Sequence, residues 1–531
     1  MKLNPSTSLV SALPAIIIAF AFFGYFYNKA FAIDDPYFLF QAQHVLTDPW
    51  HPSSFDIAWN DSFDRASILS PTGPMMAYIL VPTVLADGAE WVAHLTVTLF
   101  LCWSAYSMVR IALLLGFSRN EALVASLMLV ATPTVIAMSS TAMPDIPGLA
   151  FALAGLERWL AFQAHQKWHQ AILAFVFLSL AVLTRSHTAG IVGICALTLI
   201  LPLKGQIAKR SAWWLSVAAL AAIPAAVLLV SWVTGDTAAE TNNLAQTTSF
   251  LNLRSASSNF LAFCGHFTLA LPLALPWLLM RGKQLFRWQT LVALLPTTLI
   301  CWVTLMPWWV FVMAGLGAVS LVDILYDACQ RRDALRILLG LWLLITLPIC
   351  LYIHMPSKYL VLSVPALALL LILESRHYSR SIRRAGLGVW LAGSLLLGFL
   401  IIDFDASRTD FGRRAARELV ATKPLEGSVW YGGHWGFQWY AEKAGAKSVL
   451  SPAFQPRRGD SIVCSETFFI QTAKYHCRPR SLLEETQPGG QVMSNGAGFY
   501  SNYFGYLPIS WGRGEYERFH VLVVTDPGTR W

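Results

Sequence analysis

The sequence predicts an all-α polytopic membrane bundle of about thirteen transmembrane helices, followed by a small C-terminal α/β extracytoplasmic domain. Of its 531 residues, 56% are hydrophobic and only 13% are charged, whereas soluble globular chains are about 25% charged. Charged residues are sparse up to residue 402 and ordinary in number from Asp403 to Trp531. We therefore expect a transmembrane domain at residues 1–402 and a soluble domain at residues 403–531.

The apolar runs recur at the length that a membrane span requires, which is ~20 mostly apolar residues. They begin near residues 9, 91, 121, 146, 170, 188, 212, 259, 288, 307, 335, 358 and 385. The first run, Leu9–Tyr27, is preceded by a single charge at Lys2, which favours an uncleaved anchor over a signal peptide. In the long outer loop, residues 28–90, the stretch Met75–Ala86 is too short to span and predicts an interfacial helix.

The distribution of Lys and Arg in the short loops predicts the orientation of the chain. With the N-terminus inside, eighteen of these residues fall on the inner side and five on the outer side, as the positive-inside rule requires. An odd number of spans then places the C-terminal domain outside, in the periplasm of a bacterial inner membrane protein. The net charge of +8 arises mostly from these loops, and no basic patch with interleaved aromatics predicts nucleic-acid binding.

Cysteine usage is mostly uninformative, because six of the eight cysteines lie in or beside apolar runs. Cys464 and Cys477 lie in the C-terminal domain, where a disulfide is one of two open outcomes. No Cys and His spacing predicts a structural zinc site.

Carboxylates lie at the predicted outer ends of two spans. Asp34 and Asp35 follow the first span, and Asp145 stands at the start of the fourth. Acidic residues at a membrane surface are costly and often functional. A solvated Asp-Pro turn is the alternative for the first pair, and a helix N-cap is the alternative for Asp145.

Isolated cations occupy the other predicted outer loops. Arg185, Arg254 and Lys358 are the basic residues, and Tyr359 follows the last of them. Each one alone is also compatible with snorkelling to the interface. Together with the carboxylates they predict a site that handles a phosphate and an acidic or hydroxylic partner.

Short motifs in this order resemble the C-type glycosyltransferase fold, and in particular the protein O-mannosyltransferase-like and aminoarabinose-transferase-like enzymes of bacterial inner membranes. The Asp-Asp pair resembles that family's first acidic motif, although many members have Glu at the second position, and Met143–Pro147 resembles its second acidic motif. Further similar elements are Ser70–Pro74, Leu183–Arg185, Lys358–Leu360 with Pro365, and Gly432–Tyr440. The lipid-A-modifying branch carries a Lys before its Pro-Pro element, whereas this chain has Leu69-Ser70.

The resemblance implies a polyprenyl-phosphate-linked sugar donor and displacement at the anomeric carbon. By this analogy Asp34 acts as the base, assisted by Asp35 and Asp145, and Asp145 orients the acceptor or holds a divalent cation. Arg185, Arg254, Lys358 and Tyr359 would bind the donor phosphate. No Gly-rich phosphate loop after a strand predicts a nucleotide-sugar site.

Several alternatives stay open at the level of sequence. A polysaccharide polymerase would use the same class of donor, a lipid or solute transporter would carry its binding groups near the midplane, and an assembly factor would need far fewer spans. The acceptor, whether lipid, glycan or protein, is not predicted. In the C-terminal domain, residues 407–422 predict a helix with Arg413, Arg414 and Arg417 on its polar side, and residues 428–431 and 521–524 predict strands.

Overall fold

The computed structural model describes residues 5–59, 61–69, 73–201, 203, 210–234, 253–282, 288–422, 427–465, 476–494 and 496–526. The N-terminal part contains α1 (Pro5–Phe26), α2 (Asp35–Val45), the hairpin β1 (Asp56–Trp59) and β2 (Ser62–Arg65), α3 (Ala66–Leu69), α4 (Met75–Ile79) and α5 (Val81–Leu85). The predicted interfacial helix is therefore two short helices, α4 and α5, because the chain turns at Leu80, before Pro82.

The helical bundle follows. Its elements are α6 (Glu90–Leu114), α7 (Arg119–Ala131), α8 (Pro133–Ser139), α9 (Asp145–His165), α10 (Trp168–Thr184), η1 (Ser186–Thr188), α11 (Ala189–Ile200), α12 (Arg210–Val233), α14 (Leu253–His266), α15 (Ala274–Arg281), α16 (Trp288–Val303), α17 (Trp308–Arg331), α18 (Ala334–Leu343), η3 (Leu347–Leu351), η4 (Ser357–Ser363), α19 (Val364–Ser375) and α20 (Arg380–Ala415).

Seven helices in the described ranges are long and apolar enough to cross a membrane, or eight if the bent pair α7 and α8 is one span. That pair bends by 61° where Pro133 interrupts the backbone hydrogen bonds of the helix. Three shorter apolar helices also occur among the described residues. The chain is thus a multi-pass membrane protein, while the count of thirteen spans stays a prediction.

The bundle surrounds α9, which is buried along nearly its whole length. Small residues allow its neighbours to approach closely, and Gly155 lies against the side chain of Leu178 in α10. Close packing of small residues is the usual means by which spanning helices associate. The core therefore holds in place both ends of α9, including Asp145 at its first position.

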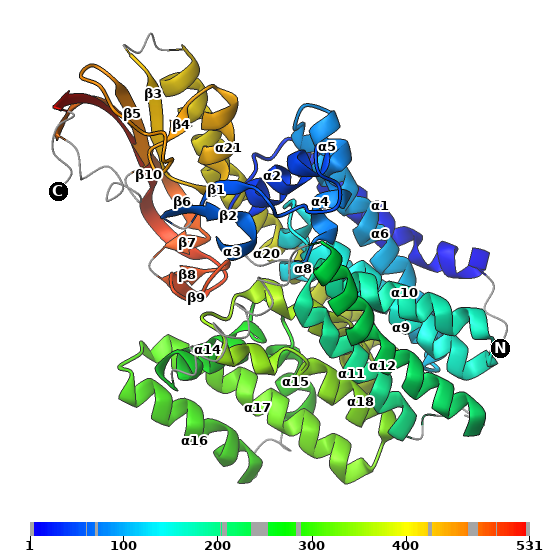
Figure 1. The fold of residues 1–531 in the computed structure, drawn as a ribbon. Helices are drawn as coiled ribbons and strands as arrows, with labels where there is room; N and C mark the ends of the chain where they lie inside the picture. The colour runs from blue at the N-terminus through cyan, green and yellow to red at the C-terminus, as the bar shows by residue number, and fades with distance from the viewer. Residues whose placement is uncertain are drawn as a thin grey trace.

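The last span continues directly into the C-terminal region, residues 403–531, which we call the tail. The boundary predicted at residue 403 falls inside α20, and a π-helical segment, η5 (Ala416–Thr422), extends it. The predicted helix over residues 407–422 is confirmed. Figure 1 shows the sheet of the tail at one end of the molecule, next to α2, α3 and α21.

The tail contains both helix and strands, as predicted. Its elements are β3 (Val429–Gly432), α21 (Trp435–Lys443), β4 (Lys447–Ser448), β5 (Ser461–Ser465), β6 (His476–Gln491), β7 (Met493–Ser494), β8 (Gly496–Gly498), β9 (Gly505–Leu507) and β10 (Ser510–Asp526). A mixed sheet has the order β4-β3-β5-β10-β6, and β7, β8 and β9 form a second sheet. The two strands predicted at residues 428–431 and 521–524 are β3 and part of β10.

The two cysteines of the tail are not joined by a disulfide in this structure. Cys464 lies on β5 and Cys477 on β6, and both strands pair with β10, which runs between them. Two strand spacings amount to about 9.5 Å, whereas a disulfide needs Cα atoms within about 7 Å. This arrangement therefore excludes the disulfide that the sequence left open.

Candidate active site

The first candidate residue, Asp34, lies in a strained loop between α1 and α2. Ile33 has φ of +46°, a conformation that is costly for a β-branched side chain. The Asp34 carboxylate, 37% exposed, forms an ion pair of 3.1 Å with the Lys358 ammonium. Strain of this kind is characteristic of functional sites. Here the strained backbone at Ile33 precedes the carboxylate of Asp34, which pairs with Lys358 from a distant segment of the chain.

Asp35 has a different environment from its neighbour. Its side chain is fully buried and accepts backbone hydrogen bonds from the N–H groups of Ala32 at 2.9 Å and Ala142 at 2.8 Å. A following proline favours an extended conformation in the residue before it, but Asp35 is instead the first residue of α2. A helix tolerates proline in its first turn, where no N–H is needed.

The pKa values of these two carboxyl groups move in opposite directions. Partial enclosure alone would raise the pKa of Asp34, but the Lys358 ammonium, helped by Arg185 and His354, lowers it below its usual value. Burial raises the pKa of Asp35 to about 7, against the opposing effects of Lys29 and the two backbone N–H groups. At neutral pH, Asp34 is therefore ionised, whereas Asp35 is about half protonated.

The second acidic residue, Asp145, faces Arg185. The closest approach is 3.4 Å between Arg185 Nε and Asp145 Oδ1, and both side chains are largely buried. Neither Asp145 oxygen, nor Arg185 Nε, forms a hydrogen bond within the described residues. The alternative role of Asp145 as a helix cap does not apply, because the N-cap of α9 is Pro144 and no side-chain cap bond is present.

Tyr359 connects the two ion pairs. The Arg185 guanidinium lies over its ring at 5.1 Å from the centroid, and the Lys358 ammonium lies at 6.0 Å. The structure thus brings together Asp34, Asp145, Arg185, Lys358 and Tyr359, which come from four separate segments of the chain. Arg254 lies at the start of α14, and its side chain is outside the described part of the structure.

Two histidines that we did not predict as site residues also contact this group. His354 lies 3.5 Å from the Tyr359 hydroxyl, and the His187 ring lies 5.1 Å from the Tyr359 ring. Burial and the cations Lys358 and Arg185 lower the pKa of His354 to about 4, so it is neutral at physiological pH. The signal for His354 in the sequence was its position four residues before Lys358.

Helix α21 of the tail packs against the strained loop that carries Asp34. The Tyr440 hydroxyl accepts a hydrogen bond of 2.9 Å from the Phe31 N–H, and Trp439 meets the Phe31 ring edge-on at 6.0 Å. Gly436 lies so close to the Phe31 carbonyl oxygen that a methyl group there would overlap it. The preceding residue, Trp435, has φ of +63°.

A second part of the tail, Phe499–Tyr503, reaches both sides of the site. The Tyr500 hydroxyl donates a hydrogen bond of 2.6 Å to Asp405, whose carboxylate pairs with Lys29 at 2.9 Å. On the other side, Ser501 Oγ lies 3.0 Å from His354 Nδ1. The tail therefore supports the acidic loop and the segment that leads to Lys358.

The described residues contain no group of three or more His, Cys, Asp or Glu side chains that could hold a metal ion. Asp34 and Asp145 each face a basic side chain instead. Binding of a divalent cation at Asp145 stays a prediction.

Comparisons with known proteins agree with this arrangement. Residues 74–234 match the family model described as dolichyl-phosphate-mannose-protein mannosyltransferase, and no curated protein matches the sequence. The structure of ArnT from Cupriavidus metallidurans bound to undecaprenyl phosphate is similar, with a TM-score of 0.54 and 12% identity, over 97% of this chain and 98% of that one. At this identity the likeness shows the fold alone, and the fold resemblance expected from the sequence is confirmed.

Weaker matches are AglB from Archaeoglobus fulgidus in complex with an inhibitory peptide and a dolichol-phosphate, and the arabinofuranosyltransferase AftD from mycobacteria. AglB has a TM-score of 0.42 and 13% identity over 86% of this chain and 69% of that one. AftD has a TM-score of 0.43 and 13% identity over 99% of this chain and 40% of that one.

Proposed function

We propose that this multi-pass membrane protein, which has the C-type glycosyltransferase fold, transfers a sugar from a polyprenyl-phosphate donor to an envelope acceptor on the outer face of the membrane. The observation that supports this proposal best is the meeting of an ionised carboxylate, Asp34, with Lys358, Arg185 and Tyr359 in one place. The family match and the fold are those of enzymes that act on lipid-linked sugars.

The proposed reaction is a displacement at the anomeric carbon of the donor. An acceptor hydroxyl oxygen forms the new bond to that carbon while the bond between the carbon and the phosphate oxygen breaks. The hydroxyl proton goes to the Asp34 carboxylate, and the polyprenyl phosphate leaves with the bonding electron pair. General-base assistance of this kind is typically worth ~10²–10⁴-fold in rate.

Lys358 and Arg185 would stabilise the negative charge that develops on the leaving phosphate. Arg185 retains a buried N–H group without a hydrogen-bond partner among the described residues. A phosphate oxygen is a suitable partner, because a charge-assisted hydrogen bond is about twice as strong as a neutral one. Asp145, held opposite Arg185 at 3.4 Å, would orient this guanidinium or the acceptor.

The experiment compares donor classes on the purified, full-length protein in lipid nanodiscs. A polyprenyl-phosphate sugar should be consumed and a nucleotide sugar should not. Transfer directly from a nucleotide sugar would contradict the proposal. Product size separates a transferase from a polymerase, since a transferase adds one sugar per acceptor and a polymerase yields a ladder.

A transporter is less well supported than a transferase. Transporters place their binding groups near the midplane on broken helices, whereas Asp34 and Arg185 lie beyond the helices α1 and α10. Flux of labelled substrate into sealed vesicles without any glycosidic product would favour transport instead.

A further inference from the structure

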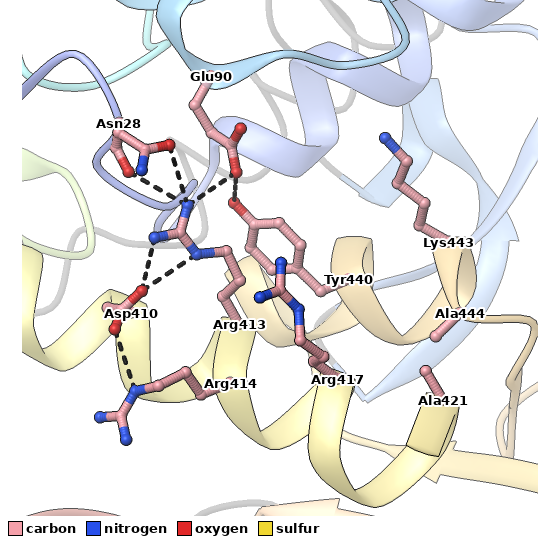
Figure 2. Close-up of a pocket in the computed structure, with 10 residues that line it drawn as sticks. All are labelled: Asn28, Glu90, Asp410, Arg413, Arg414, Arg417, Ala421, Tyr440, Lys443 and Ala444. Carbon is pink, nitrogen blue, oxygen red and sulfur yellow. Dashed lines mark hydrogen bonds and ion pairs between the residues drawn. The ribbon is translucent and has the colours of Figure 1, made fainter.

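A second basic region lies outside the candidate active site, in an open pocket of about 640 Å³ shown in Figure 2. The pocket lies where the extension of α20 meets α21 and the ends of two spans. A volume of this size is within the range of sites for small molecules and headgroups. Its ten lining residues are Asn28, Glu90, Asp410, Arg413, Arg414, Arg417, Ala421, Tyr440, Lys443 and Ala444.

The wall formed by the bundle places this pocket at the level of the membrane interface. Asn28 comes two residues after the end of α1, and Glu90 is the first residue of α6. Three aromatic side chains beside them are exposed, Tyr25 by 48%, Tyr27 by 50% and Trp91 by 51%. Exposed Tyr and Trp at helix ends are typical of the headgroup region of a bilayer.

The lining contains four basic residues and two acidic ones, so positive charge is in excess. Arg413 neutralises the acids, with ion pairs of 3.1 Å to Glu90 and 2.6 Å to Asp410. It also donates a hydrogen bond to the Asn28 carbonyl at 3.1 Å. Figure 2 shows this network, in which the Tyr440 hydroxyl donates to Glu90. These contacts build the pocket and leave Arg417 without an acidic partner among the described residues.

Arg417 is the basic residue of the pocket that neither Glu90 nor Asp410 pairs with. It is exposed, one turn beyond Arg413, and forms no hydrogen bond or ion pair within the part of the chain that the structure describes. Arg414 shares Asp410 with Arg413, at 3.0 Å, and Lys443 of α21 lines the pocket but pairs with Asp87 at 3.0 Å. Guanidinium groups bind phosphate through paired N–H donors, and a partly enclosed pocket weakens the competition from water.

We infer that this pocket binds the anionic phosphate headgroup of a lipid in the leaflet on the tail side of the membrane. The shared chemistry is a phosphate with net negative charge, held by Arg417 with the help of Arg414. A lipid is the favoured source because Asn28 and Glu90 place the pocket beside the outer ends of α1 and α6. The site does not depend on the transfer reaction, because its basic residues are separate from Arg185 and Lys358.

The test measures lipid binding by the full-length protein in nanodiscs of phosphatidylcholine that contain a small fraction of spin-labelled phosphatidylglycerol. The double variant Arg414→Gln/Arg417→Gln is compared with Arg457→Gln/Arg458→Gln, which removes the same charge from an exposed loop of the tail outside the pocket. We expect the pocket variant to lose about ten-fold in relative affinity for phosphatidylglycerol, as the loss of charge-assisted contacts implies. The control should retain wild-type affinity.

Two further arms make the result decisive. Spin-labelled phosphatidylcholine should show no difference among the three proteins, and 10-fold excess inorganic phosphate should not displace the labelled anionic lipid. Equal affinity of the pocket variant and the control for phosphatidylglycerol would overturn the inference. Full displacement by inorganic phosphate would overturn the lipid as the ligand. Should the variant unfold, Arg417→Gln alone, which breaks no described contact, replaces it.

Discussion

Two groups of charged residues lie at opposite ends of the same candidate span, Ser357–Ser375, and they differ in how far their charges are satisfied. At one end, Lys358 meets Asp34 in a single ion pair of 3.1 Å. At the other end, Glu374 lies in a buried network with Arg281 at 3.4 Å and Arg336 at 2.9 Å. The same span thus carries two charge clusters. In the sparse cluster, around Lys358, few charged groups are paired, and in the saturated cluster, around Glu374, the charged groups are paired with one another.

The saturated cluster holds α15, α17 and α19 together through buried ion pairs. Arg281 of α15 also binds Asp323 and Asp327 of α17, each at 2.9 Å, and Trp277 donates to Asp323 at 3.0 Å. Every strong donor there has a protein partner. The site near Asp34 is the reverse, because Asp145 and Arg185 approach each other without a hydrogen bond. Unused donors and acceptors in a buried place indicate where a ligand binds.

The largest expected effect comes from breaking the saturated cluster. Arg281→Met should destabilise the protein by ~3–5 kcal/mol, because Asp323, Asp327 and Glu374 lose a buried cation. Thermal unfolding in nanodiscs measures this loss. The turnover of the folded fraction should stay near that of the wild type, and a specific loss of turnover without loss of stability would reverse the roles that we assign to the two clusters.

Arg185→Gln should reduce catalysis directly, and the loss should appear in the folded fraction of the protein. We expect a loss of about 10²-fold in kcat, comparable with removal of one preorganised donor that stabilises transition-state charge. The melting temperature should fall as well, because the buried Asp145 carboxylate loses its ion-pair partner, so kcat is measured per folded molecule. Arg458→Gln, an exposed arginine of the tail, is the control for charge. Wild-type kcat in Arg185→Gln would exclude it from the leaving-group site.

A smaller effect is expected where the tail supports the Asp34 loop. Gly436→Ala introduces a methyl group that overlaps the Phe31 carbonyl, so the loop must shift and Asp34 is misplaced. A misplacement of this kind should reduce kcat by ~10-fold, with KM for the donor nearly unchanged. Gly512→Ala, also in the tail but with open space around its Cβ, should behave as wild type. Equal kcat in both variants would remove any positioning role from α21.

The smallest expected effect is a displacement of the pH profile. The base must be ionised, and Lys358 lowers the pKa of Asp34, so the acidic limb of kcat/KM should lie below the ordinary Asp value of about 3.9. Lys358→Gln removes the stabilising cation and should move this limb to higher pH. Arg185 and His354 also face Asp34, and His354→Gln shows whether a limb near pH 4 belongs to that histidine.

The same profile distinguishes the two neighbouring carboxylates. Because the pKa of Asp35 is raised to about 7, a reaction that used Asp35 as base would lose rate as the pH falls through neutrality. An acidic limb near pH 7 that Asp35→Asn abolishes would therefore assign the base to Asp35. The profile we expect has no such limb.

Much of the helical bundle was predictable, because a span is a local property of about twenty residues. Residue types at helix ends also predicted that Asp34, Asp145, Arg185 and Lys358 share one face. The contacts between the tail and this site were not predictable, since Tyr440 meets Phe31 across more than 400 residues of sequence. Nor was the conformation of Asp35, because the tertiary hydrogen bond from Ala142 outweighs the local preference imposed by Pro36.

The most direct test of the account is single-turnover transfer by Asp34→Asn beside Asp35→Asn, with a polyprenyl-phosphate sugar prebound. Asn keeps the size of the side chain but cannot accept the acceptor proton, so the rate for Asp34→Asn should fall by ~10² or more while donor affinity and folding persist. Asp35→Asn should lose less rate, because both carboxylate oxygens of Asp35 already accept backbone hydrogen bonds. Near wild-type turnover by Asp34→Asn with normal donor binding would contradict the account and direct attention to Asp35 and Asp145.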